Sequence, residues 1–302
     1  MVALTPPDTR RRTPRPVRGD RRRPGGTTTA RRRFLLHGGL ATGAFVTVYP
    51  LLWMAGSSLK PEERIFSETS PLPTEVTGAH YTEGWTAGGS FTTYLLNSLT
   101  IAVLAVIGNV LACSMAAYAF ARLEFRLRRL WFVLMLGTLM LPYHAVLIPQ
   151  YFLFHELGWT GTILPLVVPK FLATDAFFVF LLVQFIRSLP RELDQAAAVD
   201  GCNPLQTFLR VIFPLLRPAL VTTAAFTFLW TYDDFLSQLI YLSDAEDYTV
   251  PLGLRMFLNS MGDSSYGQLF AMSVVTVLPV FLLFVVFQKH LVEGVSTGSL
   301  KG

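Results

Sequence analysis

Six stretches of this chain are apolar and long enough to cross a lipid bilayer, which takes about 20 mostly apolar residues in a helix. The predicted spans are 34–59, 94–121, 130–154, 163–186, 218–242 and 269–287, of which only the fourth and fifth contain charged residues. Lipid offers the backbone no hydrogen bonds, and none of the stretches alternates polar with apolar residues, so each is predicted to be helical. Pro142, Pro149 and Pro279 are expected to kink these helices rather than end them.

The distribution of charge favours one orientation in the membrane. Only 15% of the residues are charged, whereas soluble domains carry about 25%. If the N-terminus is inside, 21 of the 25 Lys and Arg lie on the inner side, and only Lys60, Arg64 and Arg255 lie outside, against ten Asp and Glu. Because cytoplasmic loops carry the excess of Lys and Arg, we predict an all-α polytopic membrane protein with six transmembrane helices and both termini cytoplasmic.

Residues 1–33 form an arginine-rich tail outside this domain, which extends over 34–302. The tail holds 11 of the basic residues, all arginine, and the rest of the chain carries a net charge of −4. The basicity therefore belongs to a tail, which we predict to be disordered, cytoplasmic and close to anionic lipid rather than bound to nucleic acid. Arg31–Leu35 resembles a twin-arginine export signal, but the apolar stretch that follows is long for a signal peptide and favours a span.

One polar segment on the inner side, 188–216, is predicted to form a helix–glycine–helix elbow. Three consecutive alanines (196–198) favour the first helix, and Gly201 is suited to end it in a left-handed conformation. Asn203, Pro204 and Gln206 then provide an N-cap, an N1 proline and a capping box for the second helix. Both a well-capped connection and a docking element for a partner fit this pattern.

Part of the elbow resembles a known loop. Gln195-Ala196-Ala197-Ala198-Val199-Asp200-Gly201, followed at the right spacing by Phe208 and Pro214, resembles the EAA loop in permease subunits of binding-protein-dependent ABC importers. Asn97-Ser98, Ala117–Arg122 and Trp230-x-x-Asp233 support the resemblance. It covers 34–302 and is closest to the smaller, G-type subunit of maltose-like sugar importers.

The resemblance implies a MetI-like permease fold in the inner (plasma) membrane of a prokaryote. It also implies four kinds of partner: a second, distinct but homologous permease chain, two ATP-binding subunits, an extracytoplasmic solute-binding protein and membrane lipid. The expected function is to form half of the translocation pathway of a sugar or oligosaccharide importer. The residues assigned to ATPase coupling are Glu192, Gln195, Ala196, Ala197, Asp200, Gly201, Pro204, Phe208 and Pro214.

One departure from the family concerns the charge of this loop. Gln195 stands where the family has glutamate, and a neutral hydrogen bond is about half as strong as a charge-assisted one. Glu192, one turn earlier, is expected to supply the charge. ATP and Mg²⁺ are expected on the partner ATPase, because this sequence has no phosphate-binding loop ending in Gly-Lys. We therefore expect no enzymatic activity, no cofactor and no metal site in this chain.

Two further sets of residues are candidates for contact with solute or binding protein. Those for the translocation path are Asn97, Trp230, Tyr232, Asp233 and Asp234, although an aromatic belt at the interface explains the two rings equally well. Those for the binding protein, in the outer loop 248–267, are Met256, Asn259, Ser260 and Tyr266. Lys170 and Asp175 in the fourth span either pair or let the lysine reach the interface.

Two other classes of protein are weighed against an importer. A secondary transporter or channel could have six spans and buried charges, but it needs no capped cytoplasmic elbow. An intramembrane aspartyl protease resembles this chain in Tyr232-Asp233, yet the second motif, Gly-x-Gly-Asp, is absent. Asp233 and Asp234 would also point about 100° apart on a helix and could not form a catalytic pair.

Overall fold

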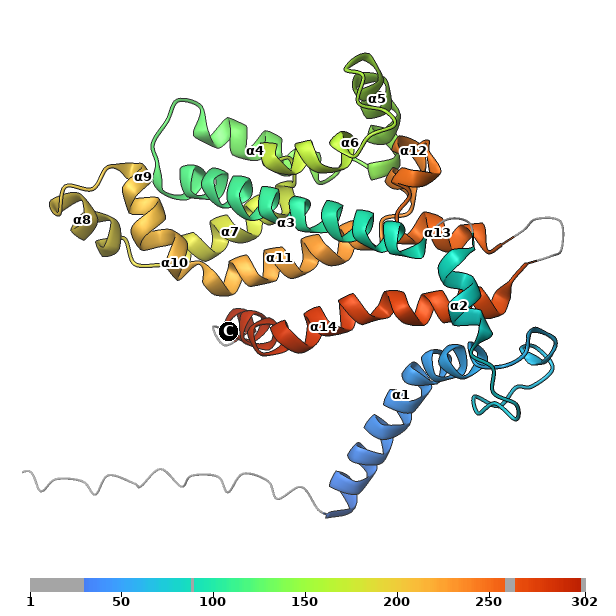
Figure 1. The fold of residues 1–302 in the computed structure, drawn as a ribbon. Coiled ribbons are helices and arrows are strands. Elements are labelled where there is room, and N and C mark those ends of the chain that lie inside the picture. The colour runs from blue at the N-terminus through green and yellow to red at the C-terminus, as the bar shows by residue number, and fades with distance from the viewer. Residues whose placement is uncertain (1–29, 88–89, 259–263, 300–302) are drawn as a thin grey trace, which may run out of the picture. The chain divides into compact units, whose positions relative to one another are not determined.

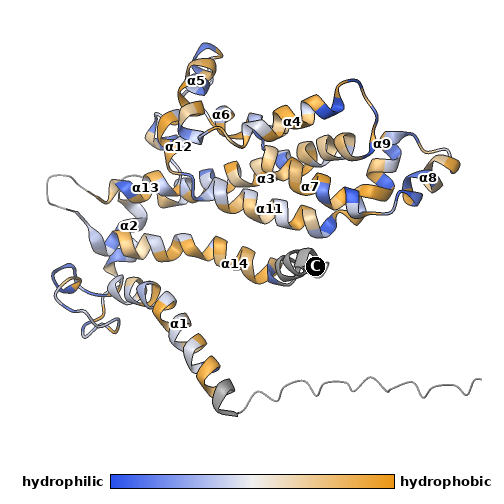
Figure 2. Cartoon of the chain, turned by 180° about the vertical axis from the view of Figure 1, so that it is seen from behind, coloured by the Kyte–Doolittle hydropathy of each residue, from blue (hydrophilic) through white to orange (hydrophobic). Residues whose placement is uncertain are grey.

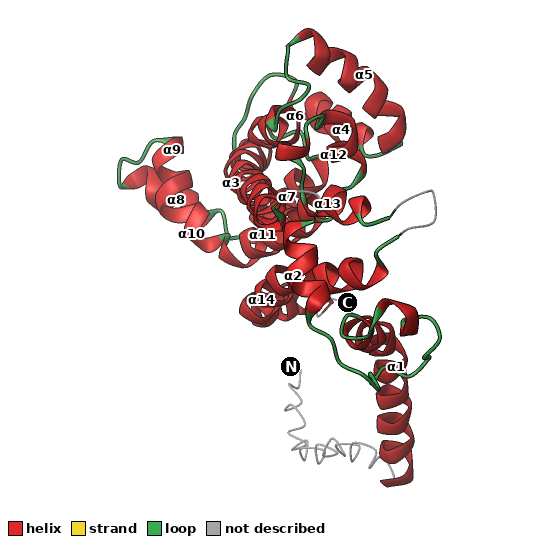
Figure 3. Cartoon of the chain, turned by 45° about the vertical axis from the view of Figure 1, so that its right-hand side comes forward, coloured by secondary structure: helices red, strands yellow, loops and turns green. Residues whose placement is uncertain are grey.

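The computed structural model describes residues 30–87, 90–258 and 264–299, and every regular element among them is a helix (Figure 3). The chain divides into two units, Met1–Pro50 and Leu51–Gly302. In the first unit, the described part is the beginning of α1 (Ala30–Ser57), whose side chains from 34 to 50 are all exposed. An apolar helical segment whose side chains are all exposed suits a lipid environment. Most of the predicted tail, residues 1–29, lies outside the described residues.

The centre of the second unit is a bundle of three helices, α3 (Phe91–Arg122), α7 (Ala176–Ser188) and α11 (Arg217–Tyr232) (Figure 1). Its core includes the fully buried side chains of Cys113, Leu182, Ile186 and Ile212. The last helix, α14 (Tyr266–Ser299), packs along α11 and against α2 (Ala79–Thr86). Apolar residues continue along α14 and the bundle helices (Figure 2), as the predicted spans require.

The structure divides the helix that the sequence predicts over 130–154. α4 (Arg128–Thr138) and α5 (Tyr143–Glu156) meet at a bend of 104°. The end of α4 tightens into i→i−3 hydrogen bonds, and Pro142, at φ −65° and ψ 126°, is the N-cap of α5. Proline has no N–H and disfavours helix before it, so Pro142 separates two helices, and the prediction that it kinks one helix is wrong.

The fourth and fifth predicted spans are also interrupted. α6 (Leu164–Val167) and the 3₁₀ turn η2 (Val168–Leu172) precede α7, with Ala173 left-handed between them at φ 54°. α11 ends before Asp233, and α12 (Leu236–Tyr241) begins three residues later. Pro149 and Pro279, in contrast, lie inside α5 and α14, as expected. Four helical segments of the described chain are long and apolar enough to cross a membrane alone. The number rises to six if each of two pairs of helices that meet at a sharp bend is counted as one span.

The remaining elements are short. They are η1 (Glu62–Arg64), α8 (Glu192–Val199), α9 (Pro204–Thr207), η3 (Phe208–Ile212), α10 (Phe213–Leu215), η4 (Ala245–Asp247) and α13 (Val250–Met256).

Candidate functional site

The first helix of the elbow ends on a glycine-dependent cap. Gly201 has φ +79°, a conformation that glycine adopts without steric cost. The N–H of Cys202 donates to Ala197 O at 2.9 Å, and the N–H of Gly201 donates to Ala198 O at 3.0 Å. These two bonds form a Schellman motif, which satisfies the last carbonyls of α8 and reverses the chain within two residues. The predicted end of the helix is confirmed.

The second half of the elbow begins with the predicted capping box. Asn203 Oδ1 accepts from the Gln206 N–H at 2.9 Å, and Gln206 Oε1 accepts from the Asn203 N–H at 3.0 Å. Pro204 occupies N1, where its missing N–H costs nothing. After one α-helical turn the chain passes through a π-helical turn, η3, an irregularity that is frequent at functional sites.

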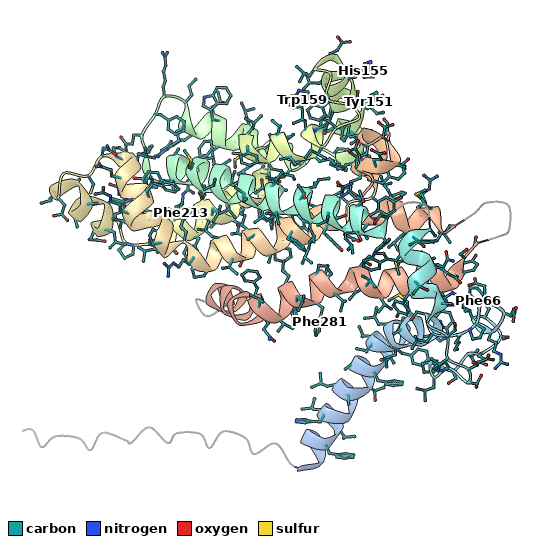
Figure 4. The ribbon with its side chains drawn as sticks, viewed as in Figure 1. Phe66, Tyr151, His155, Trp159, Phe213 and Phe281 are labelled. Carbon is teal, nitrogen blue, oxygen red and sulfur yellow. The ribbon has the colours of Figure 1, made fainter. Side chains whose placement is uncertain are left out.

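The elbow has one buried and one exposed face. Ala197, Phe208 and Ile212 are buried against the bundle, and Phe208 also packs on Phe213, labelled in Figure 4. On the other face Glu192, Gln195, Ala196, Asp200 and Pro214 are exposed. Val199 is 87% exposed. A pocket of about 400 Å³ beside this face is lined by residues that include Tyr118, Gln195, Cys202 and Thr207.

Arg122, the last residue of α3, holds the elbow to the bundle. Its Nη2 donates to Ile186 O at 3.0 Å and to Leu189 O at 2.8 Å, at the end of α7. Its Nε lies 3.1 Å from Asp194 Oδ2 in α8, with 6% of the arginine side chain and 24% of the aspartate side chain exposed. No hydrogen-bond partner reaches the Asp194 carboxylate within the described chain, so this charge depends on Arg122. The sequence indicates Arg122 only as an inner positive charge and as the end of the Ala117–Arg122 motif, and neither predicts these contacts.

The structure separates the five candidates for the translocation path. Trp230, Tyr232 and Asp233 line one cavity of about 440 Å³ between α11, α13 and α14. Asn97 and Asp234 do not line it. Asn97 Nδ2 instead donates to Glu246 O and Tyr248 O, at 2.8 and 3.0 Å.

The aspartates lie at the break between α11 and α12. Asp233 is the C-cap of α11 and is exposed, whereas Asp234 Oδ1 accepts from the Ser237 N–H at 3.1 Å. Tyr232 is buried and donates to Thr276 O at 3.2 Å. Trp230 is 53% exposed and contacts three phenylalanine rings, at 5.3–5.7 Å. Of the five side chains, those of Trp230 and Asp233 are the most accessible to a solute.

Lys170 and Asp175 pair with one another. Lys170 Nζ lies 2.9 Å from Asp175 Oδ2, and the same oxygen accepts from Asn109 Nδ2 at 2.5 Å. Asn109 also donates to Thr227 Oγ1 at 3.1 Å. This polar group connects three parts of the chain: α3, the break that precedes α7, and the helix α11. Pairing satisfies charges that would be costly inside a membrane protein.

Glu62 caps the N-terminus of α14. Its two carboxylate oxygens accept from the N–H groups of Tyr266 and Gly267, at 2.8 and 2.9 Å. A carboxylate at a helix N-terminus satisfies free N–H groups and complements the helix dipole. Phe66, labelled in Figure 4, packs edge-on against the Tyr266 ring at 4.9 Å. No local motif in the sequence marks Glu62, because its partners are about 200 residues away.

Two of the four candidates for binding-protein contact are in described segments. Met256 is 46% exposed, and Tyr266 is half-buried at the start of α14. Asn259 and Ser260 lie outside the described residues. No group of three His, Cys, Asp or Glu side chains in the described segments could hold a metal ion.

Comparisons with known proteins agree on one family. The family model described as "Binding-protein-dependent transport system inner membrane component" matches residues 108–297. The diacetylchitobiose uptake system permease protein DasC of Streptomyces coelicolor is 32% identical over 256 residues, 84% of this chain and 92% of the relative. The trehalose/maltose transport system permease protein MalG of Thermococcus litoralis is 31% identical over 272 residues, 90% and 98% of the two chains. A crystal structure of a bacterial ABC transporter involved in the import of the acidic polysaccharide alginate contains a chain of the same fold. The TM-score is 0.76 at 21% identity, covering 87% of this chain and 98% of that one.

Proposed function

The chain belongs to the family of inner membrane components of binding-protein-dependent transport systems, and from this premise we propose that it forms half of the translocation pathway of a sugar or oligosaccharide importer. Members of this family are multi-pass ABC importer permeases and are not themselves catalytic. The proposed substrate class is supported by the named substrates of similar permeases, which include diacetylchitobiose, arabinooligosaccharides and trehalose or maltose.

The elbow is proposed to be the point at which a separate ATPase acts on this chain. The supporting observation is its rigidity: Gly201 and Asn203 cap both helices, and Arg122 ties α8 to α3 and α7. Movement of an ATPase subunit against the exposed face of α8 would therefore be transmitted to the bundle instead of being absorbed by the loop. Gln195 and Glu192 are both exposed there, so Glu192 can supply the charge that Gln195 lacks.

The proposed assembly contains four further kinds of component. They are a second permease, distinct from but homologous to this one, two ATP-binding subunits with ATP and Mg²⁺, an extracytoplasmic solute-binding protein and lipid. The elbow and both termini face the cytoplasm, and the outer loop faces the binding protein. A protease is disfavoured because Asp233 is exposed beyond α11 whereas Asp234 is bonded to backbone. A secondary transporter is also disfavoured, because its mechanism would give the capped elbow no role.

Thiol labelling and cross-linking test this arrangement. In a background with Cys202→Ser, Val199→Cys is expected to react with a membrane-impermeant thiol reagent in inside-out vesicles and to cross-link to the ATPase subunit. Leu157→Cys is the matched control, because this residue is also exposed (51%) but follows α5 on the predicted outer side. It is expected to react in right-side-out vesicles and not to cross-link. Labelling of position 199 from outside would refute the orientation and the coupling role together.

The binding-protein contact depends in this proposal on Glu62. Glu62→Ala removes the carboxylate that accepts from the first two N–H groups of α14 and thereby loosens the start of the helix at Tyr266. We expect a lower ATPase activity in the presence of loaded binding protein, with basal ATPase activity unchanged. Glu63→Ala is the matched control, because the Glu63 side chain is exposed and, among the described residues, only its backbone carbonyl accepts a hydrogen bond. Equal effects of the two substitutions would contradict an anchoring role for Glu62.

A further inference from the structure

An apolar groove lies between α3, α4 and the segment that leads into α7. Its volume is about 470 Å³, and its lining includes Phe120, Phe125, Trp131, Met135 and Leu172. The one hydroxyl in the lining, on Thr138, already donates to the backbone carbonyl of Met135 at 2.6 Å. Trp131 and Leu172 are 54% and 69% exposed, so the groove is open along its side. Its lining is mostly apolar, with the Trp131 indole N–H and the Thr138 hydroxyl as the polar side-chain groups, and it offers ample contact surface.

One end of this groove meets a cluster of arginines in the turn between α3 and α4. Phe125 lines both the groove and the adjoining pocket, which is formed with Glu124, Leu127, Arg128 and Arg129. Arg128 Nη1 is occupied, because it donates to Leu123 O at 2.7 Å.

Two guanidinium groups of this turn remain available. Arg126 and Arg129 are exposed, and neither has an ion-pair or hydrogen-bond partner among the described side chains. Glu124 forms no ion pair there either. The turn from 124 to 129 thus has three arginines and one glutamate and keeps an excess positive charge next to the apolar groove. A fourth arginine, Arg187, lies over the Phe132 ring at 5.2 Å, and Phe132 packs on Phe120 of the groove.

The start of α4 adds to this positive charge. The helix has no acidic residue in its first turn and no side-chain cap, and its N-cap is Leu127, left-handed at φ 64° and exposed. Arginine in the first turn is opposed by the helix dipole, and the free N–H groups of a helix N-terminus favour an anion. Within the described chain no carboxylate pairs with this site, so the charge calls for an anion from outside the chain.

We propose that the groove and the turn together bind an anionic phospholipid. One acyl chain lies in the groove along Phe120 and Met135, and the phosphate of the headgroup binds Arg126, Arg129 and the N-terminus of α4. The apolar groove beside the cations favours a lipid over a free phosphate ion. In the orientation proposed above, this end of α4 faces the cytoplasmic leaflet, where basic pockets between transmembrane helices bind anionic headgroups. The charged turn begins at Glu124, two residues after Arg122, and the occupant of the site would therefore stabilise the connection from α3 to α4 beside the elbow.

Lipid retention by the assembled complex tests the proposal. The complex is purified in detergent, supplied with equal amounts of phosphatidylglycerol and phosphatidylcholine, and examined by native mass spectrometry. The wild-type complex is expected to retain phosphatidylglycerol, and Arg126→Gln with Arg129→Gln is expected to lower this retention by about 10- to 30-fold, at about 1 kcal/mol per contact. Arg210→Gln with Arg217→Gln removes the same charge from exposed inner positions outside the site and is expected to leave it unchanged within twofold.

A second variant separates a lipid from a simple anion. Ala116→Phe fills the groove and leaves the arginines in place. It should therefore reduce the retention of phosphatidylglycerol, while inorganic phosphate should still bind the arginines and compete with the lipid headgroup as in the wild type. If Ala116→Phe has no effect and phosphate displaces the lipid fully, the site binds an anion only and the proposal is wrong. Equal retention of both lipids, or no retained lipid in an intact wild-type complex, would also overturn it. None of these outcomes depends on sugar transport, so the test is distinct from that of the proposed function.

Discussion

Replacing Gly201 by valine is expected to abolish uptake while the chain still inserts and assembles with its partners. At φ +79° a β-branched residue is strained by about 1–3 kcal/mol, although an added Cβ would meet no described atom within 4 Å beyond its two chain neighbours. The cheapest relief is to unwind the Schellman motif, and the elbow then becomes a flexible connection. Uptake of labelled sugar should fall at least tenfold, with ATPase activity remaining, because hydrolysis would no longer be coupled to movement of the bundle.

Two controls distinguish the conformation of Gly201 from its size and from general strain. Gly201→Asn is larger than alanine yet adopts the left-handed conformation readily, so it should retain most of the uptake. Gly158→Val imposes a comparable strain at φ +68°, also with no atom within 4 Å of the new Cβ, but it lies in the loop after α5 and should preserve coupling. Normal uptake by Gly201→Val would show that the elbow does not act as a lever.

The parts of the elbow that the sequence predicts correctly are those that depend on local chemistry. The cap at Gly201 and the capping box of Asn203 and Gln206 involve residues at most five positions apart. Backbone sterics and side-chain reach decide them, and both can be judged from residue type and spacing. The all-helical fold is predictable for a similar reason, because apolar length and the hydrogen-bonding demands of lipid leave few alternatives.

The breaks in the predicted spans depend on tertiary context. A proline in an apolar stretch allows both a kinked helix and two separate helices, and Pro142 and Pro149 lie in the same stretch with opposite results. The left-handed Ala173 has no local signature, since alanine favours helix. The break there is compensated by the polar group of Lys170, Asp175 and Asn109, and one partner of that group is 66 residues away in the sequence.

Arg122 and Glu62 were missed because their roles are defined by distant backbone atoms. Arg122 binds two carbonyl groups more than 60 residues away, and Glu62 binds two N–H groups more than 200 residues away. Backbone groups have no side-chain identity for a motif to match. In the sequence, an arginine at the end of an apolar stretch is already explained by the predicted orientation in the membrane. Nothing there points to a further role for Arg122.

Replacing Arg122 by alanine is expected to have the second large effect. The substitution leaves Asp194 as a largely buried, unpaired carboxylate and removes the donors to the carbonyls of Ile186 and Leu189. Breaking one side of such a pair costs about 3–5 kcal/mol when both charges are buried, and roughly 2–4 kcal/mol is expected here because Asp194 is 24% exposed. The elbow should detach from α3 and α7, which would lower the thermal stability of the complex and reduce uptake more than ATPase activity.

A double-mutant cycle separates the ion pair from the backbone contacts. Arg122→Ala with Asp194→Asn removes the unpaired charge and should recover part of the lost stability, but not the coupling, because the two carbonyls at the end of α7 still lack their donor. Arg122→Lys retains the charge but presents a single ammonium group, which cannot bond both carbonyls and also stay beside the Asp194 carboxylate as the planar guanidinium does, so it should resemble the double variant in uptake. Arg210→Ala, at an exposed position in η3, is the control for loss of a positive charge in the elbow. If adding Asp194→Asn to the Arg122→Ala variant restored full uptake, the carbonyl contacts would have no part in coupling. Arg122 would then serve only to neutralise a buried charge.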